Sequence, residues 1–143
     1  MHTLQQILNQ KEIDEIWSVS PTDTVFEAIQ AMADKRAGAL LVMEDANLAG
    51  IISERDYARE VILKGRSSRE TLVGEIMSSD VISVASTYSV QHSLELMTEH
   101  HIRHLPVVDD GTVVGVVSIG DLVKDVISFQ QSTIEQLENY IRT

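Results

Sequence analysis

The chain contains no cysteine, few aromatic residues and half as many basic as acidic side chains (11 against 22). Without cysteine it has no disulfide, no thiolate zinc site and no cysteine nucleophile. With three Tyr, two Phe and one Trp among 143 residues, the core must be built mainly from Val, Ile, Leu and Met. No apolar run reaches the roughly 18 residues of a membrane span, and no charged-then-apolar leader marks secretion, so we expect a cytoplasmic protein. A net charge of −11 argues against non-specific binding to nucleic acid or anionic membranes.

What the chain does contain is a repeat. The segment GIISERD at residues 50–56 recurs as GVVSIGD at residues 115–121, an offset of 65 positions (115 − 50 = 65). At this offset, residues 18–61 align with 83–126 without a gap, and 12 of the 44 positions are identical. An internal repeat of this length indicates two copies of one supersecondary unit that share a core.

The hydrophobic pattern predicts the same order of elements in both copies: strand, helix, strand, strand, helix. In the first copy we expect these elements at residues 16–19, 24–35, 39–43, 48–52 and 53–64. In the second copy we expect them at residues 81–84, 89–101, 105–108, 113–117 and from 119 to about 141. An amphipathic helix is predicted at residues 3–15, and the polar stretch 66–75 is predicted to be a linker too short to separate two free domains.

A three-stranded sheet with both helices on one side leaves its other face uncovered. The sequence therefore predicts an α+β fold of two βαββα repeats, related by a pseudo-twofold axis and packed sheet to sheet, with an N-terminal helix and a long C-terminal helix. The predicted boundaries are residues 1–15 for the N-terminal helix, 16–65 and 76–127 for the repeats, 66–75 for the linker and 128–143 for the C-terminal extension.

Each repeat places a serine and an aspartate at the start of a helix, Ser53 with Asp56 and Ser118 with Asp121. One interpretation is purely structural, because both residue types cap helix N-termini and suit the positive end of the helix dipole. The other interpretation is a nucleotide site. A carboxylate can accept hydrogen bonds from a ribose diol, while hydroxyls and a helix N-terminus suit a phosphate.

The repeated motifs resemble a pair of CBS domains, named after cystathionine β-synthase and also called a Bateman module. The supporting segments are SVSPTDTV, GALLVMEDAN and GIISERD in the first copy, and ISVASTYSV, RHLPVVDDG and GVVSIGD in the second. Together they fall within residues 16–127, and they are similar to those of small stand-alone two-CBS proteins of bacteria and plant organelles. The resemblance implies no catalytic activity, but a sensor of an adenosyl ligand, with pockets in the clefts between the repeats.

The resemblance also assigns roles to individual residues. It implies that Ser53, Asp56, Ser118 and Asp121 contact ribose and phosphate, and that Arg103 and His104 approach the phosphate. Arg55 is the cation of the first copy, and Gly120 takes the equivalent position in the second. Pro106 belongs to the RHLP motif. The resemblance places Ile82 and Ile102 near the first aspartate, and Trp17 and Ala37 near the second. Because Gly38 and Ala39 replace Arg103 and His104 in the first copy, we expect two pockets of unequal affinity.

Three classes of function remain open. The leading hypothesis is a non-catalytic sensor of AMP or NAD(H), with ATP or S-adenosylmethionine as alternatives, which modulates an unidentified partner protein. The second is a structural homodimeric adaptor with non-functional pockets. The third is a metalloenzyme that uses the histidines around the second repeat, which are His92, His100, His101 and His104; nothing in the sequence completes a ligand set.

We also expect a homodimer with C₂ symmetry. The helical faces that hold Ala28, Val61, Leu94 and Val123, together with the C-terminal helix, are expected to supply its apolar surface.

Overall fold

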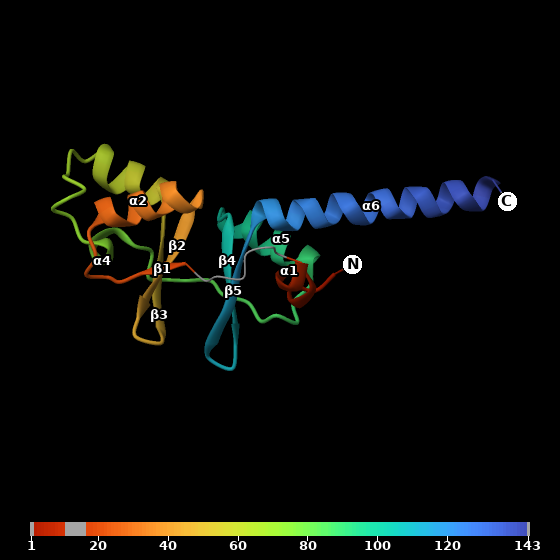
Figure 1. Ribbon diagram of the computed structural model, residues 1–143, viewed down its shortest axis with the longest axis horizontal. Helices are drawn as coiled ribbons and strands as arrows, with labels where there is room; N and C mark the ends of the chain where they lie inside the picture. Colours follow the sequence, from red (N-terminus) through yellow and green to blue (C-terminus); the bar gives the residue numbers. More distant parts are fainter. Residues whose placement is uncertain (1, 11–16, 143) are drawn as a thin grey trace. The chain divides into compact units, whose positions relative to one another are not determined.

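The computed structural model describes residues 2–10 and 17–142, which form a mixed α+β structure (Figure 1). The chain divides into two compact units. We call residues 15–82 the first unit; the second unit combines residues 1–14 with residues 83–143. Each unit contains one of the two repeats, which confirms the predicted α+β class and the doubled architecture. The pseudo-twofold axis and the sheet-to-sheet packing stay predictions.

The first unit follows the predicted order of elements. Its three-stranded sheet runs β1-β2-β3, with β1 (Ser18–Val19) parallel to β2 (Ala39–Glu44) and β3 (Asn47–Ser53) antiparallel to it. Helix α2 (Val25–Lys35) connects β1 to β2. After β3 the chain forms one α-helical turn, α3 (Glu54–Tyr57), and continues as a π-helical segment, η1 (Ala58–Ile62).

Apolar side chains from both layers make the core of the first unit. On α2, residues Val25, Ala28 and Met32 recur at helical spacing and are at most 2% exposed, and burying each larger side chain contributes roughly 1.5–3 kcal/mol. Residues 40–42 of β2 are all buried, as the continuous apolar run predicts. Ala28 and Val61, expected at a dimer surface, are 0% and 1% exposed within this unit and therefore cannot contribute to that surface.

The second unit repeats the pattern with one strand fewer. Helix α5 (Val90–His100) precedes the antiparallel hairpin of β4 (His104–Asp109) and β5 (Thr112–Ser118), and α6 (Ile119–Arg142) follows directly. The strand predicted at residues 81–84 is reduced to a single bridge between Val84 and Val107. In the first unit, Leu41 N–H donates to the Trp17 carbonyl (3.3 Å). The equivalent residue in the second unit is Pro106, which has no N–H to donate, so the ladder cannot extend there.

Small backbone details are also duplicated at the 65-residue offset. Thr24 and Ser89 cap α2 and α5, each accepting the amide three residues ahead (3.1 and 3.0 Å). Arg36 and His101 end the same helices in the left-handed region, at φ 55° and 54°. Both helices therefore stop without a glycine at this position, where glycine is the usual residue.

The segment that precedes each repeat in the sequence packs on the other repeat. Helix α1 (Leu4–Gln10), at the start of the chain, buries Leu4 and Ile7 in the second unit. Helix α4 (Val73–Ile76) lies between the repeats in the sequence and buries two residues of its own in the first unit. Thr3 forms a β-bridge with Ser89, and the corresponding bridge of the first unit joins the residue before α4 to the cap of α2.

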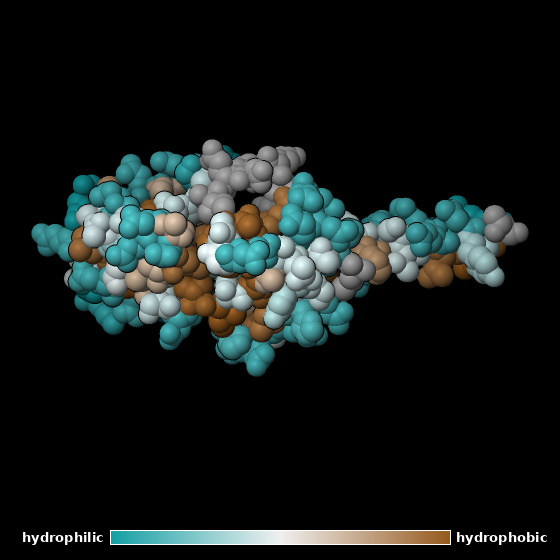
Figure 2. Space-filling model, turned by 90° about the horizontal axis from the view of Figure 1, so that it is seen from below, coloured by the Kyte–Doolittle hydropathy of each residue, from teal (hydrophilic) through white to brown (hydrophobic). Residues whose placement is uncertain are grey.

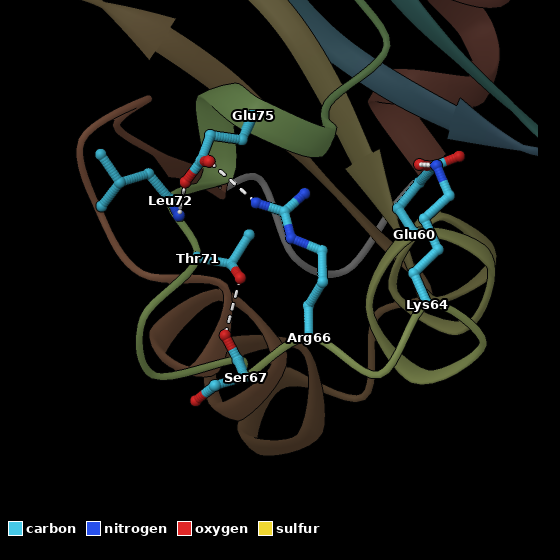
Figure 3. A network of polar contacts seen from close by, with 7 residues as sticks. All are labelled: Glu60, Lys64, Arg66, Ser67, Thr71, Leu72 and Glu75. Carbon is cyan, nitrogen blue, oxygen red and sulfur yellow. Dashed lines mark hydrogen bonds and ion pairs between the residues drawn. The ribbon is translucent and has the colours of Figure 1, made fainter.

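Polar contacts join α4 to the chain just before it (Figure 3). Arg66 forms an ion pair with Glu75 (2.8 Å), and Glu75 also accepts the Leu72 N–H (2.7 Å). The bond from the Leu72 N–H, followed by the Arg66 bond and the nearby guanidinium charge, holds the pKa of Glu75 below its ordinary value. Thr71, 2% exposed, donates its hydroxyl to the Ser67 carbonyl (2.7 Å). The Thr71 and Ser68 carbonyls accept the first two amides of α2 (2.8 and 2.9 Å), so residues 66–75, predicted to be a polar linker, include part of the packed unit.

The repeated glycines make room for these two segments. A Cβ atom at Gly50 would lie 2.7 Å from the Ser78 carbonyl oxygen and 2.8 Å from the Met77 sulfur. At Gly115 it would lie 2.6 Å from a terminal methyl group of Leu8, on α1. The first contact involves rigid backbone and the second a flexible side chain. Close approach of a neighbouring segment, and not the turn itself, explains both glycines.

Candidate functional site

A reciprocal capping box stands at the start of the helix in both repeats. At Ser118 the backbone N–H donates to Asp121 Oδ2 (2.9 Å), and the Asp121 N–H donates back to the Ser118 hydroxyl (3.1 Å). At Ser53 the same pair of bonds to and from Asp56 measures 2.9 and 3.2 Å. The structural interpretation of these residues is therefore confirmed: each box satisfies amide groups that the helix leaves open.

The backbone carbonyl just before β2 and the one just before β4 each accept a hydrogen bond from the start of the helix that follows the hairpin. The Arg103 carbonyl accepts the first helical amide, that of Ile119 (2.8 Å), and the Gly38 carbonyl accepts that of Glu54 (3.1 Å). The first and third amides of each helix are thus bonded within the protein. Neither of these bonds uses the second helical amide, which belongs to Arg55 in the first unit and to Gly120 in the second. Amide groups of the first turn point out of a helix N-terminus, where anions bind.

The hairpin of the second unit brings four predicted residues to one place. His104 is the strand partner of Ser118 in the β4–β5 register, and Arg103 is bonded through its carbonyl to the residue after Ser118. Arg103 is exposed, while His104, Ser118 and Asp121 are half-buried. The backbone positions of a cation, an imidazole, a hydroxyl and a carboxylate therefore lie close together at one helix start, and such groups can bond to phosphate and ribose oxygens.

The equivalent place in the first unit is less basic. Ala39 is the strand partner of Ser53, so neither Gly38 nor Ala39 offers a side-chain donor. The exposed Arg55 supplies a cation from the helix itself. The two helix starts are thus alike in hydroxyl and carboxylate and unlike in their cations.

The remaining predicted residues are spread over both units. Trp17 accepts a β2 amide through its carbonyl, and the Lys35 ammonium lies 5.1 Å from its ring centroid. Ala37 and Ile102 are half-buried just beyond the ends of α2 and α5, and Pro106 is buried in β4. Ile82, also half-buried, belongs to the first unit. The ligand-binding roles of all these residues, and the location of the pockets between the repeats, stay predictions.

The histidines of the second repeat do not assemble into a metal centre in the described part of the chain. His100 and His101 are exposed at the end of α5, and His92 packs near the Tyr88 ring with centroids 6.1 Å apart. Among residues 2–10 and 17–142, no group of three or more His, Asp or Glu side chains is placed to hold a metal ion.

One buried acid was not predicted from the sequence. Asp125, on α6, is 6% exposed, and one of its carboxylate oxygens contacts His2 Nδ1. The other, Oδ2, has no hydrogen-bond partner among the residues that the structure describes. The pattern of α6 gave no signal for this contact, because an aspartate within a helix is ordinarily solvated and its partner lies 123 positions away.

A second acid ties the hairpin to the loop before α5. Asp109 accepts both the backbone N–H (2.9 Å) and the hydroxyl (2.6 Å) of Ser86. Both bonds lower the pKa of Asp109, and the bond from the hydroxyl has the larger effect.

Comparison with known proteins places this geometry among CBS domains. A family model of the CBS domain matches residues 11–63 and 73–128. The chain is 41% identical over 138 residues to the CBS domain-containing protein CBSX3, mitochondrial, of Arabidopsis thaliana, a match that covers 92% of this chain and 67% of the relative. The solved structure of a protein with CBS domains from Burkholderia ambifaria MC40-6 is similar with a TM-score of 0.87 and 49% identity, covering 89% of this chain and 95% of that one.

A more distant structure is that of the CBS domain pair of protein MJ0100, in complex with 5′-methylthioadenosine and S-adenosyl-L-methionine. It has a TM-score of 0.78 and 23% identity, and it covers 91% of this chain and 98% of that one. At this identity the likeness concerns the fold.

Proposed function

The chain belongs to the CBS-domain family, and we propose on this premise that it is a non-catalytic regulatory protein that senses an adenine nucleotide. The observation that carries the proposal is the gathering of Arg103, His104, Ser118 and Asp121 at the start of α6. The duplicated box at the start of α3 would provide a second, less basic site.

The chemistry of the box is compatible with a ligand as well as with a cap. Both boxes use the Oδ2 atom of the aspartate for the serine amide, and in the first box this atom also accepts the Ser53 hydroxyl (3.0 Å). A carboxylate has about four acceptor positions, so a ribose diol can bond to it while the cap persists. A phosphate would meet the second helical amide and the neighbouring cations.

We propose AMP or NAD(H) as the ligand, with ATP and S-adenosylmethionine as alternatives of the same adenosyl class. The complex of the MJ0100 domain pair with two adenosyl compounds supports this class for the fold. Binding would act as a switch on a partner protein. Because Asp121 lies in the first turn of α6, a change at this site would be transmitted directly to that helix.

The test of the sensor hypothesis is ligand-induced thermal stabilisation with a panel of AMP, NAD⁺, NADH, ATP and S-adenosylmethionine. A ligand present at about 100 times its Kd should stabilise the folded state by about 2.7 kcal/mol. Absence of any shift across the panel at millimolar concentration would favour the second candidate, a structural adaptor. Mass spectrometry of small molecules that co-purify with the protein would identify a ligand directly.

The proposal includes a homodimer, a regulated protein partner and a cytoplasmic location, with no nucleic-acid or membrane partner. The Arabidopsis relative is named as mitochondrial. No helix in residues 2–10 and 17–142 combines the length and the apolar character needed to cross a membrane. Incubation of the protein with each nucleotide, followed by chromatography, tests the non-catalytic part: turnover would contradict it.

A further inference from the structure

The outer part of α6 carries an apolar stripe that the second unit does not cover. Figure 1 shows this part of α6 projecting beyond α1 and α5, and Figure 2 shows hydrophobic residues along it. The exposed fractions are 42% for Val123, 57% for Ile127, 54% for Ile134, 58% for Leu137 and 80% for Ile141. Side chains of this kind and exposure, aligned on one helix, mark an interaction surface.

The stripe has the period of a coiled coil. Ile127, Ile134 and Ile141 are seven residues apart, and Val123 and Leu137 alternate with them at steps of four and three. This is a heptad pattern with isoleucine at every a position and Val123, Gln130 and Leu137 at the d positions. Isoleucine at a with leucine at d, the combination of Ile134 and Leu137, favours two-stranded parallel coils.

A different face of α6 packs against the second unit. Leu122 and Asp125 are the buried residues of this helix. At about 100° per residue, they lie roughly 100–160° around the helix from the middle of the stripe. The stripe, which begins at Val123, therefore lies on a different face of α6 from the one that packs against the second unit.

The polar residue within the stripe points to a second copy of the same chain. Gln130 occupies the central d position, where a foreign apolar helix would leave its amide unpaired. In a parallel, in-register pair, Gln130 meets the same amide of the partner helix, and each amide can donate to and accept from the other. A single buried polar residue at an a position fixes register in coiled coils, and Gln130 would have the same effect at its d position.

Charge is compatible with self-association at this surface. The chain as a whole carries −11, so most of its surface would repel a second copy. The a and d positions carry no charge. In the parallel arrangement, the flanking positions pair Val126 with Gln131 and Thr133 with Glu138 of the partner, which places no like charges together.

An antiparallel pair is the main alternative. It would place Lys124 opposite Glu138 of the partner, but it would set Gln130 against the apolar Ile134. An exposed ion pair contributes less than the penalty for a buried amide without a partner. We propose that residues 123–141 of α6 form a parallel, in-register, two-stranded coiled coil with a second copy of this chain. This surface is distinct from the helix start at Ser118, and the proposal is independent of nucleotide binding.

The absence of cysteine makes this proposal directly testable in the full chain. In Leu137→Cys, a parallel coil brings the two new thiols to facing d positions, within disulfide range. The matched control is Ser132→Cys, at an f position on the outer side of the same helix. Both residues are exposed within one chain, so neither change disturbs the folded unit. Mild oxidation without nucleotide, followed by a non-reducing gel, reports only on the tail.

We expect disulfide dimers of Leu137→Cys to exceed those of Ser132→Cys by about tenfold or more, because only the first pair has suitable Cα separation. Adding Ile134→Lys to Leu137→Cys should abolish the excess. In an antiparallel coil the two Leu137 positions would lie about 15 Å apart, and Leu137→Cys would instead cross-link to Ile127→Cys in a mixture of the two variants. That result would overturn the parallel arrangement. Equal yields for Leu137→Cys and Ser132→Cys would overturn the coil itself.

Discussion

Two substitutions at Asp121 separate its capping role from its proposed ligand role. In Asp121→Asn, the amide oxygen can still accept the Ser118 N–H, which now lies 2.9 Å from Oδ2. The new NH₂ group cannot accept a ribose hydroxyl, and the negative charge is lost. Asp121→Ala removes the acceptor as well. The two variants therefore differ in the cap and agree in the loss of the carboxylate.

The expected stabilities follow from the exposure of the box. Loss of a capping acceptor at a helix start costs about 1 kcal/mol, so Asp121→Ala should lower the melting temperature by roughly 3–5 °C in a chain of this size. Asp121→Asn loses mainly the favourable interaction of the charge with the helix dipole, about 0.3–1 kcal/mol. Thermal unfolding followed by circular dichroism measures both.

The expected affinities do not follow the same order. Hydrogen bonds to a charged group contribute roughly 1.5–3 kcal/mol each when fully desolvated. Because Asp121 is only half-buried, we expect a combined loss of about 1.5–3.5 kcal/mol, so both variants should lose about tenfold to several hundredfold in affinity at this site. Calorimetric titration of the more stable Asp121→Asn is the decisive case. If it bound as tightly as wild type while Asp121→Ala did not, the carboxylate would be a cap alone and the reasoning about the ribose would be refuted.

Three further predictions concern the fold. Gly50→Ala should destabilise the protein by about 1–3 kcal/mol and Gly115→Ala by less, since the first meets backbone and the second a flexible leucine; equal losses in urea unfolding would contradict this. His2→Ala should cost about 1–3 kcal/mol by removing the partner of a buried carboxylate oxygen on α6, and an unchanged urea midpoint would argue against the contact. Because the pKa of Asp109 is lowered in the folded state, its bonds to Ser86 stabilise the protein above the unfolded pKa and are lost as pH falls through the folded one. Ser86→Ala should therefore differ from wild type most near neutral pH, and least once the pH is low enough to protonate Asp109 in the folded protein.

Most of the fold could be predicted from the internal repeat and its hydrophobic pattern. The continuous apolar run at residues 40–42 and the serine and aspartate at each helix start are local signals, and the structure realises them as a buried strand and as capping boxes. The long closing helix also follows from its own periodicity. These features depend on residues close together in the sequence, so a single sequence suffices to predict them.

Other features depended on contacts that no local pattern encodes. The packing of α1 and α4 on the opposite repeats joins residues far apart in the chain, and the stretch before α4 is polar enough to resemble a linker. The missing strand near Val84 follows from one absent amide, at Pro106 in a neighbouring strand. The carbonyl of Arg103 at the start of α6 is a backbone group, which side-chain motifs do not reveal.

The central claim is that the duplicated serine–aspartate boxes bind an adenosyl ligand. Its most direct test is isothermal calorimetry of the wild-type protein with AMP, NAD⁺, ATP and S-adenosylmethionine, beside a variant that carries Asp56→Asn and Asp121→Asn together. The account predicts saturable binding of at least one of these ligands to the wild type, with no more than two sites per chain, and loss of that binding in the double variant, which keeps its caps. Binding of equal affinity in the double variant, or no binding of any adenosyl compound to the wild type, would contradict it.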